Sequence, residues 1–451
     1  MSDCLVLAGD CRQLLALLPP ESVHCAITSP PYFGLRAYGT APQVWGGDPA
    51  CEHQFETHRY YTEQSASQGS GEAFSAAGEA NQARLKQARW REDATCARCG
   101  AWRGELGLEP SPAQYVAHLV AVFQAVRRVL RSDGTLWLNL GDSYARSAAK
   151  GQHKPGDTGK NAAVYDRGAG RTSATLDLTA QGLKEKDLIG VPWRVAFALQ
   201  ADGWYLRSDI IWAKGNPMPE SVTDRPTRSH EYLFLLTKSE RYYYDHEAVR
   251  EPAVSTHGSG NGYQRKEQVS RGGRGSETPW HPQSQRNRRS VWHVNTRPFK
   301  GAHFATFPPE LVEPCLLAGT SEGGCCGACG APFQRQVEKG EPNRAWQRAC
   351  GGDAAGEYAG RATKDYATAG AQDASATKAR ILAGMVERRT VGWAPGCDCG
   401  APATPCRVLD PFGGAGTVGL VARRHGRHAL LLELNPDYAQ MARVRIMEER
   451  N

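Results

Sequence analysis

A glycine-rich turn between an apolar strand and a helix restricts the fold of this chain more than any other feature. Gly414, Gly416 and Gly419 form a G-x-G-x-x-G pattern after RVLD and before TVGLVARRH. Glycines permit a tight turn and let backbone amides approach a ligand closely. Glu433 lies in the next apolar run, ALLLELN, where a Rossmann-type fold places a carboxylate that accepts hydrogen bonds from ribose hydroxyls. The pattern therefore predicts a site for a nucleoside-bearing cofactor.

The place of this unit in the chain bears on the kind of cofactor. The turn alone equally suits a nicotinamide enzyme, and an ordinary strand-to-helix turn without a ligand is a further alternative. A dinucleotide fold normally opens the chain with this unit, whereas here the unit closes the chain. Asp410, Pro411 and Phe412 also directly precede the glycines. Turn, acid and context together favour a cofactor site of another class.

Apolar patterns typical of strands and helices alternate along the chain. LVLAG and VHCAI read as buried strands on either side of the helical segment CRQLLALLP. Further helices are expected in 112–130, 187–204 and 307–320, and further strands in 134–142, 208–214 and 231–239. This alternation predicts an α/β fold with a parallel sheet.

Size, charge and apolar content narrow the class of protein. The chain has 451 residues and a formal net charge of +7, which suggests an anionic partner without identifying one. It contains no run of about 20 apolar residues, and its first residues lack the layout of a signal peptide. We expect a soluble, cytoplasmic protein that is large enough to bury a core.

A second motif, TSPPYFGL at residues 28–35, places a hydroxyl, two prolines and an aromatic after a buried strand. Together with DPFGGAGTVG and LELNPDY, it resembles the beta class of exocyclic-amino DNA methyltransferases, which act on N(4) of cytosine or N(6) of adenine. In that class the catalytic motif comes first and the cofactor motif last. The resemblance implies a permuted, Rossmann-like methyltransferase fold that uses S-adenosylmethionine.

The resemblance also implies residue roles. The catalytic residues would be Ser29, Pro30, Pro31 and Tyr32. Ser29 Oγ and the Pro30 carbonyl would accept the two N–H hydrogens of the target amine, and Tyr32 would stack on a base flipped out of the duplex. The cofactor would be bound by Asp10, His303, Phe304, Thr306, Pro308, Asp410, Pro411, Phe412, Gly414, Gly416, Thr417, Glu433 and Asn435.

A motif that begins with serine, as at position 29, resembles the motif of the cytosine-amino enzymes more than that of the adenine enzymes. N(4) of cytosine is therefore the favoured target and N(6) of adenine is the alternative. No cysteine nucleophile is needed at an exocyclic amine, so Pro314-Cys315 and Pro405-Cys406 are interpreted as structural. His230 and Glu231 begin a strand, where they would either line the base pocket or pair with each other.

Fourteen cysteines in a cytosolic chain favour metal ligands or buried thiols over disulfides. Cys96-x-x-Cys99 before a glycine is typical of a zinc knuckle, and Cys51 with His53 would complete four ligands. A second set combines Cys326 and Cys329 with Cys397 and Cys399. We expect two zinc-ribbon-like insertions with structural zinc, and free thiols are the alternative.

Basic and aromatic side chains gather between Arg265 and Lys300, where Arg286, Arg288 and Arg289 are the candidate DNA-binding residues. Basic groups would neutralise phosphates while aromatics stack on bases, although a solvated loop would have the same composition. The expected partners are double-stranded DNA and a cognate restriction endonuclease.

The expected organisation has seven parts. The catalytic domain comprises 1–50, 110–245 and 401–451; 51–109 and 321–400 are insertions with the cysteine sets, 246–300 is a basic target-recognition region and 301–320 closes over the cofactor. Two rival functions remain: an inactive zinc-containing DNA-binding protein, and a methyltransferase of RNA or of a protein amide, where the motif usually starts with Asn.

Overall fold

The protein is represented by a computed structural model. The structure describes residues 3–35, 38–61, 88–92, 94–145, 182–252, 285–297, 307–342 and 386–449. These residues divide between two compact units. Unit 1 comprises Met1–Ser29, Val126–Asn139 and Trp204–Asn451, and unit 2 comprises Pro30–Ala125 and Leu140–Gly203. One boundary between the two units thus lies between Ser29 and Pro30, inside the SPPY motif.

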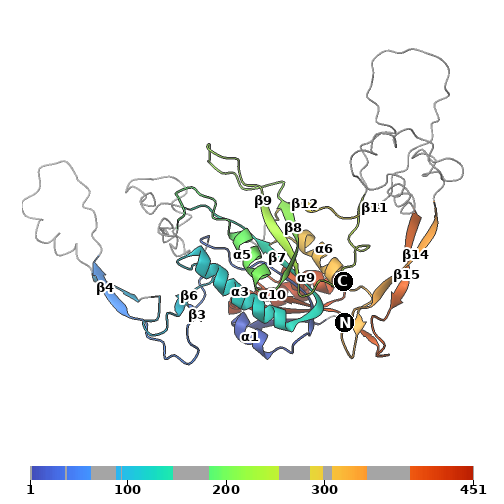
Figure 1. Cartoon of the computed structure of the whole chain (residues 1–451), viewed down its shortest axis with the longest axis horizontal. Coiled ribbons are helices and arrows are strands. Elements are labelled where there is room, and N and C mark those ends of the chain that lie inside the picture. Colours follow the sequence, from blue (N-terminus) through green and yellow to red (C-terminus); the bar gives the residue numbers. More distant parts are fainter. Residues whose placement is uncertain are drawn as a thin grey trace, which may run out of the picture. The chain divides into compact units, whose positions relative to one another are not determined.

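Unit 1 is built on an eight-stranded sheet with the order β1-β18-β17-β2-β7-β9-β8-β12, of which β7, β8, β9 and β12 are labelled in Figure 1. Its strands are β1 (Cys4–Ala8), β2 (Val23–Thr28), β7 (Leu130–Leu140), β8 (Tyr205–Ala213), β9 (His230–Thr237), β12 (Val291–His293), β17 (Arg407–Asp410) and β18 (His428–Glu433). At one side of the sheet, the two last strands of the chain, β18 and β17, lie between the two first strands of the sheet, β1 and β2.

The prediction of a parallel sheet is right for part of the sheet only. Strands β1, β18, β17, β2 and β7 pair in parallel. Strands β8 and β9 pair antiparallel as two arms of a hairpin whose connection, residues 214–229, is closed at its base where Lys214 N–H donates to the Ser229 carbonyl at 2.8 Å. Strand β12, which lies in the predicted basic region, adds in parallel to β8.

Three helices of unit 1 pack on each other and on the sheet: α6 (Pro309–Gly319), α9 (Thr417–Arg424) and α10 (Pro436–Glu448) (Figure 1). Apolar residues of these helices and of the strands form one buried core. Close packing depends on Gly419, where an added Cβ would lie 2.5 Å from Ile446 Cδ1. A shorter helix, α1 (Cys11–Leu17), follows β1. The sequence patterns predicted all of these helices except α10.

Helix α3 (Pro112–Val129) belongs mostly to unit 2, and α5 (Val191–Ala201) belongs to it entirely. Asp142 accepts hydrogen bonds from Gly190 and Val191 N–H at 3.1 and 3.0 Å, which satisfies amides at the start of α5. Unit 2 also contains two short antiparallel pairs, of β3 (Gln43–Trp45) with β6 (Trp102–Gly104) and of β4 (Thr57–Tyr61) with β5 (Ala88–Glu92). It therefore extends beyond the expected insertion.

The remaining strands of unit 1 form three further antiparallel pairs. They are β10 (Glu251–Pro252) with β11 (Gln285–Arg286), β13 (Cys325–Cys326) with β16 (Ala403–Thr404), and β14 (Gln334–Pro342) with β15 (Val386–Ala394). The last two pairs lie in or beside the expected insertion 321–400. Among the described residues, no helix has the length and apolar content needed to cross a membrane.

Candidate active site and cysteine clusters

Four adjacent strands of unit 1 end at chemically important residues. Asp410 and Glu433 are the last residues of β17 and β18, Ser29 directly follows β2, and Asp10 lies two residues beyond β1. These strands are parallel neighbours, so their carboxyl ends lie at one edge of the sheet. Ligands of open α/β sheets bind at this kind of edge.

Asp410 is buried and its side chain is held by two donors. Its Oδ1 accepts hydrogen bonds from Thr28 Oγ1 at 2.6 Å and from Phe412 N–H at 3.0 Å. Burial raises the pKa of Asp410 to about 7, although both hydrogen bonds act in the opposite direction. The sequence reasoning did not single out Thr28, because a threonine at the end of a buried strand carries no signal of a distant partner.

Glu433 holds the glycine turn. Its two oxygens accept hydrogen bonds from Gly414 N–H at 2.7 Å and from Asn435 N–H at 2.9 Å. A carboxylate has about four acceptor positions, so this one can also accept from a ligand. Burial raises its pKa. Gly416 has a φ of 76°, and an added Cβ would lie 2.8 Å from Ala442 Cβ, so this position requires glycine.

Other predicted cofactor residues also have structural contacts. Asp10 caps α1 and pairs with Arg12, whose Nη2 lies 2.5 Å from Oδ2. Thr417 Oγ1 accepts from Arg445 at 3.1 Å, and Asn435 Oδ1 caps α10 by accepting from Asp437 N–H at 2.9 Å. Pro411 is buried before the turn. Pro308 is the cap residue of α6, whereas His303, Phe304 and Thr306 lie outside the described residues.

In unit 2, contacts from three separate parts of the chain fix the Pro31–Tyr32 segment. Tyr115 Oη donates to the Pro31 carbonyl at 2.7 Å. The Tyr32 ring lies against the backbone of Gly141, where an added Cβ would be 2.5 Å from Cε2. Gly107, with a φ of 94°, lies close to the Tyr32 carbonyl: a Cβ added at Gly107 would be 2.9 Å from that oxygen. Pro30 is buried and Ser29 half-buried.

A polar cluster beside β2 was only partly foreseen. Thr28 pairs in register with Leu138, so Asn139 lies on the strand next to Ser29. Asn139 is buried and donates to Glu231 Oε2 at 3.2 Å, and Glu231 also pairs with Lys214. Glu231 was a candidate, but Asn139 and Lys214 were missed. Glu231 lies on β9, Asn139 on β7 and Lys214 directly after β8, and only the fold brings the three together.

The two Pro-Cys cysteines are both buried. Cys315 lies within α6 and its thiol donates to the Leu311 carbonyl at 3.3 Å. Burial raises the pKa of Cys315 well above the usual range for a thiol. Cys406 is also fully buried, next to the start of β17. Neither thiol is placed as an accessible nucleophile.

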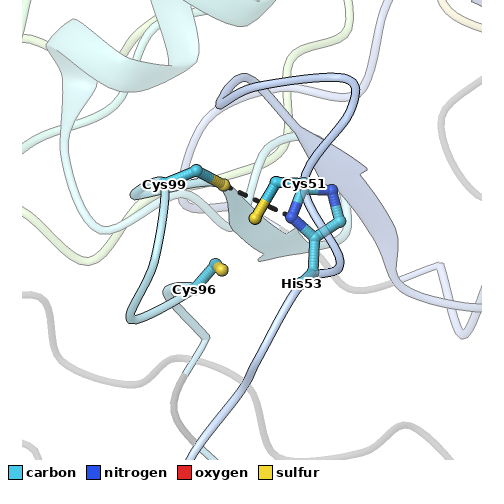
Figure 2. Close-up of side chains that lie close together, drawn as sticks. All are labelled: Cys51, His53, Cys96 and Cys99. Carbon is cyan, nitrogen blue, oxygen red and sulfur yellow. Dashed lines mark hydrogen bonds between the residues drawn. The ribbon is translucent and has the colours of Figure 1, made fainter.

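The structure brings together each of the two predicted cysteine sets. In unit 2, the ligand atoms of Cys51, His53, Cys96 and Cys99 lie within 4.8 Å of one another (Figure 2). In unit 1, the sulfurs of Cys326, Cys329, Cys397 and Cys399 lie within the same distance. A third group, which the sequence did not reveal, contains His24, Cys325 and Cys406.

The arginines proposed for DNA contact have partners in unit 1. Arg286 Nε and Arg289 Nε lie 2.8 and 2.6 Å from the same oxygen of Glu251. The guanidinium of Arg288 lies 4.5 Å from the centre of the Trp292 ring. Arg289 is exposed and the other two are half-buried. The other basic residues predicted between 265 and 284, and Lys300, lie outside the described residues.

Comparison with known proteins adds to this geometry. A family model described as an N6/N4-type DNA methylase matches residues 23–326. The Type II methyltransferase M.Cfr9I of Citrobacter freundii is 35% identical over 449 residues, covering 100% of this chain and 89% of the relative. M.SmaI of Serratia marcescens is 31% identical over 450 residues, covering 100% and 93%. The solved structure of the PvuII DNA methyltransferase, described as cytosine-N4-specific, is 13% identical with a TM-score of 0.45. The match covers 100% of this chain and 89% of the PvuII chain.

Proposed function

The chain belongs to the N6/N4 family of exocyclic-amino DNA methyltransferases, and on this premise we propose that it methylates N(4) of cytosine at a specific site in double-stranded DNA. The observation that carries the proposal is the placement of Ser29, Asp410 and Glu433 at the ends of adjacent strands. In that arrangement, the proposed acceptor for a target amine would lie next to the proposed cofactor site.

The residues of unit 1 fit S-adenosylmethionine, which supplies an electrophilic methyl group when it is bound. The Glu433 carboxylate offers acceptor positions for ribose hydroxyls at the end of β18. The glycine turn exposes backbone next to it, and Asp410 fixes that turn through Phe412 N–H. This chain's part in cofactor binding is therefore to hold a rigid, pre-formed edge.

Ser29 and Pro30 would orient the target amine. The lone pair of an exocyclic amine is delocalised into the base, so the nitrogen is a poor nucleophile. When Ser29 Oγ and the Pro30 carbonyl accept its two hydrogens, the nitrogen becomes more amine-like and its lone pair is directed at the methyl group. Tyr32, held on Gly141, would stack on the flipped base. No cysteine takes part, in agreement with the burial of Cys315 and Cys406.

The order of the motifs supports the permuted arrangement of the beta class. The catalytic strand β2 comes early in the chain and the cofactor strands β17 and β18 come last, yet they are neighbours in the sheet. We further propose that the enzyme acts beside a cognate restriction endonuclease, as expected for relatives named Type II methyltransferases. Serine at position 29 is what favours cytosine over adenine.

The test is expression in a host that lacks DNA modification, followed by nucleoside mass spectrometry and sequencing that detects modified bases. We expect N(4)-methylcytosine at one recurring sequence. N(6)-methyladenine at such a site would retain the family and overturn the choice of base. Ser29→Ala should reduce transfer by on the order of 10² or more, while Ser22→Ala, at the other end of β2, should not.

RNA and protein substrates are separated from DNA by competition in the same assay with labelled S-adenosylmethionine. Transfer to duplex DNA that excess RNA or protein leaves unchanged supports the proposal. Absence of any labelled product from active-site-intact protein would instead favour the inactive DNA-binding alternative.

A further inference from the structure

Two of the three clusters of cysteine and histidine have the ligand set of a structural zinc site. Thiolate sulfur and imidazole nitrogen are the ligands that zinc prefers, in groups of four. At a Zn–S distance of about 2.3 Å, sulfurs at the corners of a tetrahedron lie about 3.8 Å apart. Both four-membered sets have their ligand atoms within 4.8 Å of one another, so small side-chain movements would close each tetrahedron.

The backbone around the two sets has the same local geometry, although the sets lie in different units. Cys96 N–H donates to the Ala101 carbonyl at 2.7 Å, and Gly100 N–H donates to the Cys96 carbonyl at 3.0 Å. The same pair of bonds recurs around Cys326, with the Ala331 carbonyl at 2.9 Å and Gly330 N–H at 2.8 Å.

Gly100 and Gly330 have φ values of 73° and 72°, which favour glycine in both turns. Each turn directs two sulfurs, spaced as Cys-x-x-Cys, to the same side.

The fourth ligand of the first set is also in place. His53 Nδ1 lies 3.3 Å from Cys99 Sγ and faces the three sulfurs (Figure 2). Gln54 N–H donates to Cys96 Sγ at 3.3 Å, a contact that stabilises a thiolate. Gly47 allows the chain before Cys51 to approach the Cys96–Cys99 turn, because a Cβ added at Gly47 would lie 2.8 Å from Cys99 Sγ.

The third group does not fit a metal. His24 Nδ1 accepts a hydrogen bond from Arg407 N–H at 3.0 Å, so Nε2 carries the proton, which it donates to the Gly330 carbonyl at 2.8 Å. Neither ring nitrogen has a lone pair left for a metal. Cys325 and Cys406 then provide only two ligands, and the group has no fourth member among the described residues.

We propose that the chain binds two zinc ions, one through Cys51, His53, Cys96 and Cys99 and one through Cys326, Cys329, Cys397 and Cys399, and none at His24. Both ions are structural, because each set provides four protein ligands and leaves no open position for a substrate. The second ion also lies far from Ser29 along β2. Its turn is held by His24, five residues before Ser29, which corresponds to about 16 Å of extended strand.

The first zinc site connects to the catalytic loop through contacts inside unit 2. The Trp45 and Trp102 rings, on the strands that flank the site, both stack on His118, with ring centres 5.0 and 5.5 Å away. His118 Nδ1 lies 3.0 Å from the buried carboxylate of Glu109, which in turn accepts from Gly107 N–H at 2.7 Å. Gly107 supports the Tyr32 backbone.

It follows that the first zinc ion positions Tyr32 for the target base, whereas the second stabilises the described segments 321–342 and 386–400. This step on Tyr32 rests on the proposed function. The two zinc sites themselves do not, because metal content is measured without activity.

The first experiment is elemental analysis of the full-length protein purified without chelator. We expect about two zinc ions per chain in the wild type and about one in His53→Ala and in Cys329→Ser. His53→Cys retains four ligands and should restore two. Cys4→Ser and Cys325→Ser, outside the two sets, should keep two. Less than about 0.2 zinc per chain in the wild type, three zinc ions, or no loss in the two ligand variants would overturn the proposal.

A second measurement remains valid even where a variant fails to fold. Wild-type protein produced in cobalt-supplemented medium should show the intense visible absorption of tetrahedral cobalt bound by thiolates. If cobalt is incorporated without this absorption, the proposed ligands are wrong.

The third measurement tests the role of the first ion, with 2-aminopurine at the target position as a reporter of base flipping. His53→Ala should lose most of the fluorescence increase and raise the KM for DNA several-fold, and its affinity for S-adenosylhomocysteine should stay within about twofold. Cys329→Ser should retain the increase. Equal effects of the two variants would show that the first ion only stabilises the fold, and no increase with wild type would instead count against the proposed function.

Discussion

The hydroxyl of Thr28 donates a 2.6 Å hydrogen bond to the carboxylate of Asp410, and both side chains are buried. Thr28 ends the strand that leads into Ser29, and Asp410 ends the strand that leads into the glycine turn. A contact between residues 382 positions apart thus joins the proposed catalytic motif to the proposed cofactor motif. Its removal should affect both the stability of the fold and the cofactor site.

Thr28→Val keeps the shape of the side chain and removes the donor. A buried carboxylate that loses one of its partners typically costs about 1–3 kcal/mol, so we expect that loss in the free energy of unfolding and a weaker affinity for S-adenosylhomocysteine. Urea denaturation and calorimetry measure the two effects. Thr237→Val is the matched control: Thr237 is equally buried and donates to the Ser239 carbonyl at 2.8 Å on β9. Thr237→Val should lower the free energy of unfolding without changing the affinity for S-adenosylhomocysteine. If the two variants bind S-adenosylhomocysteine equally well, the Thr28–Asp410 contact does not support the cofactor site.

The raised pKa of Asp410 predicts a pH dependence of stability. Its folded pKa of about 7 exceeds the unfolded value, so the folded protein binds this proton more tightly than the unfolded chain does. The stability that Asp410 contributes is therefore fully present below about pH 4 and is lost as the pH rises through about 7. We expect the free energy of unfolding of the wild type, relative to Asp410→Asn, to fall across this range and to level off above it. Parallel profiles of the two proteins would show that Asp410 has an ordinary pKa.

The local elements could be predicted from sequence because each has its own pattern. The strand before Ser29, the turn at Gly414–Gly416 and the acid Glu433 were all found in this way, as was the membership of both four-residue cysteine sets. Spacing indicated each Cys-x-x-Cys turn because such a turn is local, and the second pair of each set was then assigned to it from the same expected insertion.

Contacts that only the fold creates could not be found. Thr28 meets Asp410, and Asn139 meets Glu231, because strands from distant parts of the chain become neighbours in the sheet. The antiparallel pairing of β8 and β9 was missed because alternating apolar patterns do not state direction. The pairing of Glu251 with Arg286 and Arg289 could not be found either, because Glu251 lies 35 residues from Arg286 in the chain.

Gly141→Ala tests the placement of Tyr32. The new methyl group would lie 2.5 Å from Tyr32 Cε2, so the ring has to move. We expect a loss of base stacking, worth roughly 1–3 kcal/mol, and a correspondingly weaker affinity for duplex DNA in which the target base is present but mismatched. Affinity for S-adenosylhomocysteine should not change. Gly392→Ala is the control, because nothing lies within 4 Å of its added Cβ and its φ is not positive. If both variants bind such DNA like the wild type, Tyr32 does not contact the base.

The last prediction concerns the arginines that share Glu251. If Arg286, Arg288 and Arg289 lie along DNA, replacing all three by glutamine removes up to three phosphate contacts and flattens the dependence of log affinity on log salt by up to about three units. Glu251 offsets part of their charge, as it pairs with two of them. Glu251→Gln should therefore change affinity in the opposite direction and strengthen binding to random duplexes at low salt.

The measurement is binding of wild type and both variants to cognate and random duplexes over a range of salt. A fall in site preference, rather than in the salt slope, would mean that one of the arginines reads a guanine edge, at about 1–3 kcal/mol for the contact. Arg389→Gln is the control for charge alone, since Arg389 is an exposed arginine paired with Glu338 on β14–β15. Arg389→Gln removes one charge and the triple variant removes three. If the loss of DNA affinity for each charge removed is the same in both, binding responds only to net charge, and the surface that reads DNA lies elsewhere in the chain.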